Sequence, residues 1–181
     1  MTFFISGGAK NGKSSLAQRL AVSLSGDGRR YYVATMLSTG AEDDARIRRH
    51  IADRAGLGFE TVECAKNILS VLDRAEPSGT FLVDSVTALL QNAMFPAERD
   101  YALDLPAAER CGSELVTFAG LAGNVVFVSD FIASDCERYS ETTEAYRKQL
   151  AEIDRRLAAV CGTVVEVSAG IPIVHKGALP I

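Results

Sequence analysis

The chain alternates between short apolar runs and longer stretches in which apolar residues recur at helical spacing. The apolar runs have strand length, and they predict strands at residues 2–5, 31–35, 80–84, 124–129 and 163–167. The other stretches predict helices over about residues 13–24, 41–54, 85–95, 106–122 and 140–160. Strands that alternate with helices are typical of a parallel sheet covered by helices on both faces.

Three further segments give weaker signals. Residues 59–63 alternate in polarity and predict a short strand, followed by a helix to about residue 75. Residues 96–106 contain two prolines and mixed charge, which predicts a surface connection. Because Pro172 cannot donate to a ladder, residues 171–174 are predicted to form an antiparallel edge strand. We find no repeat, low-complexity tract or linker, and residues 1–181 are therefore predicted to form a single α/β domain.

The first predicted strand leads into a glycine-rich turn and a helix, in the sequence FFISGGAKNGKSSLAQRL at residues 3–20. Eight residues fit the phosphate-binding pattern G-x-x-x-x-G-K-[ST]: Gly7, Gly8, Ala9, Lys10, Asn11, Gly12, Lys13 and Ser14. Glycines let main-chain N–H groups approach an anion, and the following helix adds the positive end of its dipole. Lys13 can reach the β- and γ-phosphates of a nucleotide, and the Ser14 hydroxyl can bind Mg²⁺. A turn with a surface lysine is the alternative, which the flanking strand and helix disfavour.

Asp84 ends the predicted strand at residues 80–84. The carboxyl ends of parallel strands form one edge of a sheet, where ligands bind and where Gly7 would also lie. A carboxylate there can hold Mg²⁺ directly or through water, and this is the role predicted for Asp84. The alternative is an aspartate that caps the helix beginning near Ser85.

The helix predicted over residues 41–54 carries an unusual group of side chains. Arg46, His50 and Arg54 are four residues apart and share one face, while Ile47 and Ile51 mark the side expected to be buried. A neutral imidazole is a capable nucleophile toward phosphorus, and flanking guanidinium groups can stabilise displaced negative charge. From spacing alone, a solvated helix face with an incidental histidine is the simpler interpretation.

The overall composition disfavours several classes of protein. The chain has 181 residues, enough for a sizeable core, and its net charge of −4 argues against a nucleic-acid partner. No apolar run reaches the length of a membrane span, and we see no signal peptide. His175 lies in no motif and is expected to be structural or exposed. A cytoplasmic protein with reduced thiols and no zinc site is predicted, because no C-x-x-C pair occurs among Cys64, Cys111, Cys136 and Cys161.

Several of these segments together resemble a known family. They are the turn at residues 7–14, Tyr32-Val33-Ala34-Thr35, Arg46-Ile47-x-x-His50 with Arg54, Thr61-Val62-Glu63 and residues 167–172. This set is similar to the bifunctional adenosylcobinamide kinase / adenosylcobinamide-phosphate guanylyltransferase of cobalamin biosynthesis. The similarity spans nearly the whole chain. The P-loop alone is shared by many families, whereas the Y-[IV]-A-T, R-I-x-x-H and T-V-E segments are much more specific.

The resemblance implies a RecA-like P-loop sheet, usually assembled as a homotrimer. It implies phosphorylation of the aminopropanol hydroxyl of adenosylcobinamide with ATP or GTP, then transfer of GMP from GTP to that phosphate with release of pyrophosphate. The second reaction would run through a guanylylated histidine, which is His50 here, so that one transfer is split into two steps. The residues matching the family's nucleotide contacts are Gly7 to Ser14, Ala34, Thr35, Met36, Ile51, Ala52, Asp53, Arg54, Glu63 and Asp84.

The sequence departs from the family pattern in three places. After the fifth strand the family usually has an Asn-Glu pair and a glycine-rich loop ending in Val-Pro, whereas residues 128–136 read VSDFIASDC. Asp154-Arg155 stand where the family tends to have Asn-Gln, and Phe59 stands where it has Trp. These differences bear on recognition of the acceptor and on which of the two activities the chain retains.

Two other functions are consistent with the residues alone. One is a different small-molecule P-loop kinase, in which His50 only positions a ligand or lies at the surface. The other is a non-catalytic nucleotide-binding regulator. The regulator is disfavoured because no N-K-x-D motif occurs and the one D-x-x-G, Asp53 to Gly56, follows a predicted helix.

Overall fold

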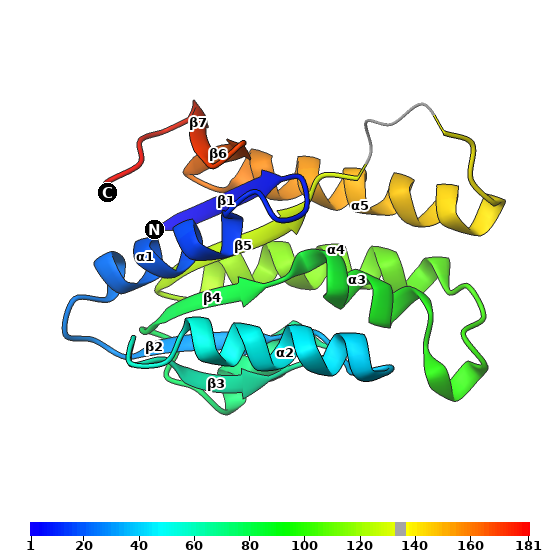
Figure 1. Cartoon of the computed structure of the whole chain (residues 1–181), viewed down its shortest axis with the longest axis horizontal. Helices are drawn as coiled ribbons and strands as arrows, with labels where there is room; N and C mark the ends of the chain where they lie inside the picture. The colour runs from blue at the N-terminus through cyan, green and yellow to red at the C-terminus, as the bar shows by residue number, and fades with distance from the viewer. Residues whose placement is uncertain (133–136) are drawn as a thin grey trace.

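The structure, a computed structural model, describes residues 1–132 and 137–181. Seven strands form one sheet in the order β3-β2-β4-β5-β1-β6-β7 (Figure 1). Their bounds are β1 Thr2–Gly7, β2 Arg30–Ala34, β3 Glu60–Glu63, β4 Thr80–Asp84, β5 Asn124–Asp130, β6 Thr163–Ser168 and β7 Ile171–Lys176. The pairs are parallel from β3 to β6, and β7 is antiparallel to β6. The predicted α/β fold class and the antiparallel edge strand are confirmed.

Helices cover both faces of this sheet, as the strand and helix alternation predicts. On one face lie α1 (Lys13–Ser25) and α2 (Ala41–Asp53), in front of the sheet in Figure 1. On the other face lie α3 (Val86–Met94), α4 (Leu105–Leu121) and α5 (Glu141–Val160). The short 3₁₀ helices η1 (Ile68–Asp73) and η2 (Ala97–Arg99) belong to connections between these elements.

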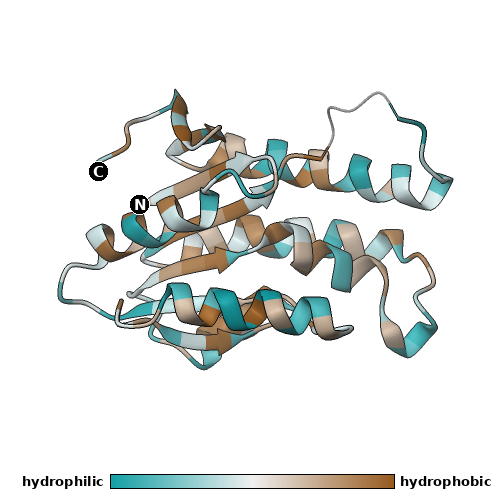
Figure 2. Ribbon diagram, in the orientation of Figure 1, coloured by the Kyte–Doolittle hydropathy of each residue, from teal (hydrophilic) through white to brown (hydrophobic). Residues whose placement is uncertain are grey.

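The central strands are buried on both sides, which explains why they appear in the sequence as continuous apolar runs. In β4, Phe81, Leu82 and Val83 are fully buried. Phe81 and Val83 pack into the core shared with α3, α4 and α5, whereas Leu82 packs into the core under α1. Successive side chains of a strand point to opposite faces, so both cores draw on the same strands. Figure 2 shows hydrophobic residues in brown along the central strands.

Two segments differ from their predicted structure. The helix expected to continue to residue 75 is the short 3₁₀ helix η1, in which Ile68 and Val71 are both buried. A 3₁₀ helix has three residues per turn, so this spacing puts both side chains on the core side. The connection expected over residues 96–106 contains η2 and already includes the start of α4, where the Asp104 side chain accepts a hydrogen bond from the Ala107 N–H.

Candidate active site

The carboxyl ends of the parallel strands meet at one edge of the sheet, and candidate residues gather there. β1 leads into residues 7–14, β4 ends at Asp84 and β5 ends at Asp130. β4 and β5 are neighbours, and Asp84 is paired with Val128, two residues before Asp130. With about 4.8 Å between strands and about 3.3 Å of rise per residue, the Cα atoms of the two aspartates are about 8 Å apart.

Two glycines shape the turn between β1 and α1. Gly7 has a φ of 155°, and a Cβ atom there would lie 2.4 Å from the carbonyl oxygen of Val167. Gly12 precedes α1 with a φ of 86°, a left-handed conformation that favours glycine. The turn therefore leads directly into the N-terminus of α1. Free N–H groups and the helix dipole favour the binding of a phosphate there.

The lysine of this turn is buried and paired. The Lys13 side chain is only 6% exposed, and its Nζ donates to the carbonyl oxygen of Gly8 at 2.7 Å. The same atom forms an ion pair with Asp130 Oδ1 at 2.9 Å. No role was predicted for Asp130, although it ends an apolar strand just as Asp84 does. The missing information was the strand order, which places β5 beside β1 and puts β4 one strand further away.

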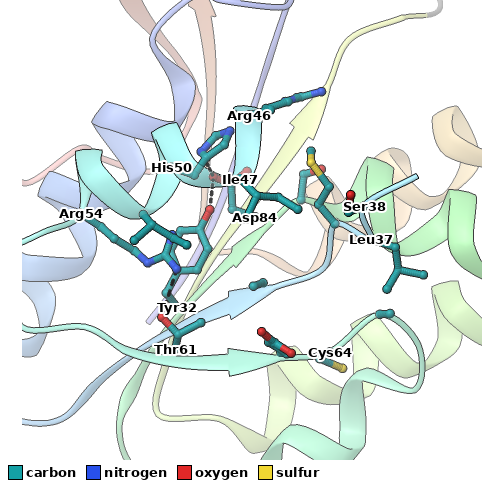
Figure 3. A pocket seen from close by; sticks show the side chains of 16 residues that line it. Tyr32, Leu37, Ser38, Arg46, Ile47, His50, Arg54, Thr61, Cys64 and Asp84 are labelled. Carbon is teal, nitrogen blue, oxygen red and sulfur yellow. Dashed lines mark hydrogen bonds and ion pairs between the residues drawn. The ribbon is translucent and has the colours of Figure 1, made fainter. Parts of the chain in front are cut away.

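A pocket of about 530 Å³ lies between α2 and the ends of β2, β3 and β4 (Figure 3). From α2 it is lined by Arg46, Ile47, His50, Ile51 and Arg54. The prediction that Ile47 and Ile51 mark a buried side is wrong, because α2 has no buried residue and Ile51 is 51% exposed. The helix stands over a pocket instead of a packed core, so its apolar and basic side chains share the pocket wall.

Within this pocket the His50 ring lies against Asp84 (Figure 3). The buried Nδ1 atom of His50 is 3.8 Å from Asp84 Oδ2 and has no hydrogen-bond partner among the described residues. Asp84 Oδ2 also accepts a hydrogen bond from the Tyr32 hydroxyl at 3.0 Å. The capping role considered for Asp84 belongs instead to Ser85, whose side chain accepts from the Ala88 N–H. The Asp84 carboxylate therefore faces the pocket.

Tyr32 extends this network to Arg54. The Arg54 guanidinium carbon lies 4.1 Å from the centre of the Tyr32 ring, and its Nη2 donates to Thr61 Oγ1 at 3.1 Å. Burial, followed by the negative charge of Asp84, raises the pKa of Tyr32 far above its ordinary value. The hydroxyl consequently stays protonated and keeps donating to Asp84. Arg54, Tyr32 and Asp84 thus form one connected support beside His50.

The predicted nucleotide contacts divide between the turn and the pocket. Those that line the pocket are Ala34, Met36, Ile51, Arg54, Glu63 and Asp84. Thr35, Ala52 and Asp53 do not line it, and no residue of 7–14 does. Thr35 is fully buried, and its hydroxyl donates to the carbonyl oxygen of Ser85 at 2.8 Å and accepts from the Ser85 N–H at 2.7 Å. Its hydroxyl therefore holds the backbone of Ser85, a residue that lines the pocket.

One side chain of the turn fits a magnesium ion. The Ser14 hydroxyl at the start of α1 is a hard oxygen donor, which Mg²⁺ prefers together with phosphate and water oxygens. The contacts of Asp84 are with Tyr32 and His50, so its role toward Mg²⁺ stays a prediction. Within residues 1–132 and 137–181, no cluster of three or more His, Cys, Asp or Glu side chains is arranged as a metal site.

Of the remaining candidate side chains, Cys64 lines the pocket beside α2, whereas Cys111, Cys161 and His175 do not. Cys64, Cys111 and Cys161 are buried and unpaired, while Cys136, like the rest of residues 133–136, falls outside the described residues. Burial raises the pKa of Cys111 to about 12 and that of Cys161 to about 11, so these thiols stay protonated and unreactive. His175 is exposed, with its Nε2 3.0 Å from Glu166 Oε2.

Comparison with known proteins gives the site its context. Residues 3–175 match the sequence profile of the family described as cobinamide kinase / cobinamide phosphate guanyltransferase. The chain belongs to this family. It is also 30% identical over 182 residues to the bifunctional adenosylcobalamin biosynthesis protein CobP of Pseudomonas aeruginosa, with 98% of each chain covered. The resemblance seen in the sequence is confirmed, and this member of the cobinamide kinase / cobinamide phosphate guanyltransferase family is a transferase.

Solved structures share its fold. The flagellar accessory protein FlaH from Methanocaldococcus jannaschii superposes with a TM-score of 0.51 at 13% identity, covering 97% of this chain and 78% of that one. The ATPase domain of G40P gives a TM-score of 0.55 at 12% identity, covering 97% and 76%. At such low identity the likeness shows the P-loop NTPase fold alone. In the part of the chain that the structure describes, we find no helix with the length and apolarity needed to cross a bilayer.

Proposed function

We propose that this family member carries out both reactions. It phosphorylates the aminopropanol hydroxyl of adenosylcobinamide with ATP or GTP, and it then transfers GMP from GTP to adenosylcobinamide phosphate through a guanylylated His50. The family description names both activities, and the relative from Pseudomonas aeruginosa is named as bifunctional. The observation that carries the histidine step is the contact of the buried His50 Nδ1 with Asp84 in a pocket at the carboxyl edge of the sheet.

The turn at residues 7–14 serves the phosphoryl transfer. Its N–H groups and the N-terminus of α1 bind the phosphates of the nucleotide. On nucleotide binding, Lys13 turns from Gly8 and Asp130 toward the β- and γ-phosphates, where its charge stabilises the transferred group. Ser14 and Asp84 would hold Mg²⁺, which neutralises phosphate charge when it is bound.

His50 serves the guanylyl transfer. With Nδ1 directed at Asp84, the other ring nitrogen, Nε2, is the nucleophile. Nε2 attacks the α-phosphorus of GTP, a P–N bond forms, and the bond to the leaving pyrophosphate breaks. A phosphate oxygen of the acceptor then attacks the same phosphorus, and the P–N electron pair returns to the ring.

Asp84 acts on this chemistry through the imidazole. A carboxylate beside Nδ1–H fixes the tautomer that leaves Nε2 unprotonated, and it stabilises the positive charge that develops on the ring. Tyr32 holds that carboxylate through its hydrogen bond, and Arg54 packs on the Tyr32 ring. Arg46 and Arg54, which line the same pocket, supply positive charge near the α-phosphate.

The resemblance also leads us to propose a cytoplasmic homotrimer. Size-exclusion chromatography with light scattering measures the assembly: a mass of about three chains of 19.4 kDa is expected, and a monomer mass would refute this part.

Incubation with α-³²P-labelled GTP tests the histidine step directly. A phosphoramidate is acid-labile and base-stable, so the wild type should carry acid-labile label that His50→Ala abolishes. His175→Ala is the matched control, because it removes the other histidine of the chain and should leave the label unchanged. Absence of label from the wild type, or its survival in His50→Ala, would overturn the proposed intermediate. Product mass analysis with adenosylcobinamide and each nucleotide then identifies the phosphoryl donor.

A further inference from the structure

A second cavity, of about 550 Å³, lies on the opposite face of the sheet from α1. Its walls are Phe4 and Ser6 of β1, residues 130–132 at and after the end of β5, and one face of α5 that includes Ala151 and Asp154. The lining is mainly apolar with a few polar groups, which is typical of a small-molecule site. None of the chemistry described above makes use of this cavity.

The cavity adjoins the phosphate-binding turn. Ser6 in its wall directly precedes Gly7, and the Phe131 N–H donates to the Gly7 carbonyl oxygen at 2.9 Å. Asp130, also in the wall, is the carboxylate that pairs with Lys13 at 2.9 Å. A molecule seated in the cavity would therefore end beside the residues that handle the γ-phosphate.

The wall is held in place by hydrogen bonds from two helices. The Asp130 N–H donates to Thr87 Oγ1 at 2.8 Å, and Tyr146 on α5 donates its hydroxyl proton to the Thr87 carbonyl oxygen at 2.9 Å. Arg147 Nε donates to the Ile132 carbonyl oxygen at 3.1 Å. These bonds fix residues 130–132 between the turn and α5, so the cavity is a preformed one.

Polar groups inside the cavity and beside it have no protein partner. The Oδ1 atom of Asp154 and the Oγ atom of Ser129 are buried, and neither has a hydrogen-bond partner within the described part of the chain. Burial raises the pKa of Asp154 to about 7, and the neighbouring Ser129 hydroxyl, which favours the charged form, offsets only part of this effect. Buried polar atoms normally find partners, and an unpartnered carboxyl oxygen at a cavity wall is a place for the polar group of a ligand.

We propose that this cavity receives the phosphoryl acceptor, with the acceptor hydroxyl beside Asp130. The inference rests on the proposed kinase reaction and adds to it the acceptor subsite and a catalytic residue. The hydroxyl oxygen attacks the γ-phosphorus, an O–P bond forms, and the bond between the γ-phosphorus and the β,γ-bridging oxygen breaks. The nucleoside diphosphate leaves, and Asp130 takes the hydroxyl proton as general base.

The size and rim of the cavity fit part of such an acceptor. About 550 Å³ admits the aminopropanol arm, and the larger corrinoid ring system stays at the mouth. Phe131, 49% exposed, offers an apolar surface there, and Lys148 and Arg155 add positive charge at the rim. Positive charge suits the phosphorylated product, which the second reaction takes as its acceptor.

Filling the cavity tests this assignment. Ala151→Trp places a large side chain in the cavity and leaves every charged residue of its wall unchanged, and Ala159→Trp makes the same change at an exposed position of the same helix. We expect Ala151→Trp to raise the KM for adenosylcobinamide by about tenfold or more, since lost subsite contacts weaken acceptor binding. The KM for the nucleotide and the labelling of His50 by GTP without acceptor should stay at wild-type values, as should all three readouts in Ala159→Trp.

Different results would refute the cavity assignment and the proposed kinase function. If the wild type makes cobinamide phosphate and a folded Ala151→Trp protein makes it with an unchanged acceptor KM, the cavity assignment is wrong and the kinase function stands. If the wild type makes no cobinamide phosphate, the proposed kinase function falls and the subsite falls with it. Calorimetric titration of adenosylcobinamide into the folded proteins adds a readout without turnover, in which Ala151→Trp should bind about tenfold more weakly than Ala159→Trp.

Discussion

The Nδ1 atom of His50 and the Oδ2 atom of Asp84 are 3.8 Å apart, from a helix on one side and a strand end on the other. This distance is longer than a hydrogen bond, but it leaves Nδ1 directed at a carboxylate and Nε2 as the remaining ring nitrogen. The position of the Asp84 carboxylate depends on Tyr32, whose hydroxyl donates a hydrogen bond to the same Oδ2 atom. The tyrosine hydroxyl would thus position Asp84 beside His50, the nucleophile that we propose.

Tyr32→Phe should slow the labelling of His50 by GTP by about tenfold, because Asp84 loses a hydrogen bond that directs it. The KM for GTP should stay within about twofold, since the phenyl ring still supports Arg54. Rapid-quench measurement of label against time gives both values. Tyr31→Phe is the matched control: the buried Tyr31 hydroxyl accepts from the Glu76 N–H at 3.1 Å, away from the pocket. Equal labelling rates in the two variants would show that the Tyr32 hydroxyl has no positioning role.

Lys13→Met should abolish most kinase activity, by about a hundredfold or more, because it removes the charge that we propose to stabilise the transferred γ-phosphoryl group. It should also destabilise the fold by about 1–3 kcal/mol, because it leaves the largely buried Asp130 carboxylate unpaired. Urea unfolding and the kinase assay measure the two effects separately.

The double variant Lys13→Met/Asp130→Asn separates stability from catalysis. It should regain most of the lost stability, because the unpaired charge is gone, while kinase activity stays low. Substantial phosphorylation by either variant would contradict the role given to Lys13, and failure of the double variant to regain stability would contradict the importance of the pair.

The strands were predictable because they are buried on both faces, so that a run such as Phe81-Leu82-Val83 needs no other context to be recognised. The glycine-rich turn was predictable because its motif is a contiguous pattern of eight residues between a strand and a helix. The order of the strands, in contrast, depends on pairing between segments that are far apart in the sequence. Asp84 and Asp130 end similar apolar runs, and only the sheet shows that Asp130 is beside Lys13 and Asp84 beside His50.

Helix α2 shows the second limit of prediction from sequence. Apolar periodicity identifies the face of a helix that meets a core, but Ile47 and Ile51 line a pocket instead. It cannot tell a packed core from a pocket. Arg46, His50 and Arg54 line the same pocket. The contact between Tyr32 and Arg54 could not be predicted from the sequence, because only the tertiary structure brings these two residues together.

Gly7→Ala should destabilise the protein by about 2–4 kcal/mol, because its Cβ would lie 2.4 Å from the backbone of β6 and one of the two strands must shift. Gly12→Ala is the informative comparison. No atom lies within 4 Å of a Cβ there, and only the left-handed φ of 86° opposes it, at about 1 kcal/mol. Urea unfolding of both variants decides the matter, and a Gly12→Ala protein as unstable as Gly7→Ala would show that crowding against Val167 is unimportant.

Asp154 should make the stability of the protein depend on pH. Burial raises its pKa to about 7, against about 3.9 in the unfolded chain. Between these values the native state keeps a proton that the unfolded state has released. The free energy of unfolding should therefore fall as the pH rises from about 4 to about 7, by about 1.4 kcal/mol per unit of pKa difference.

Asp154→Asn removes this dependence while keeping the shape of the side chain. Its stability relative to the wild type should be nearly constant below about pH 4 and should rise by a few kcal/mol by pH 8, where the wild type buries a charge. Urea unfolding from pH 4 to pH 8 measures the difference. Glu152→Gln, on the same helix with a side chain 43% exposed, is the control and should run parallel to the wild type. If Asp154→Asn also ran parallel to it, the carboxyl group would be in contact with water or with a partner, and the polar end of the cavity beside α5 would already be satisfied.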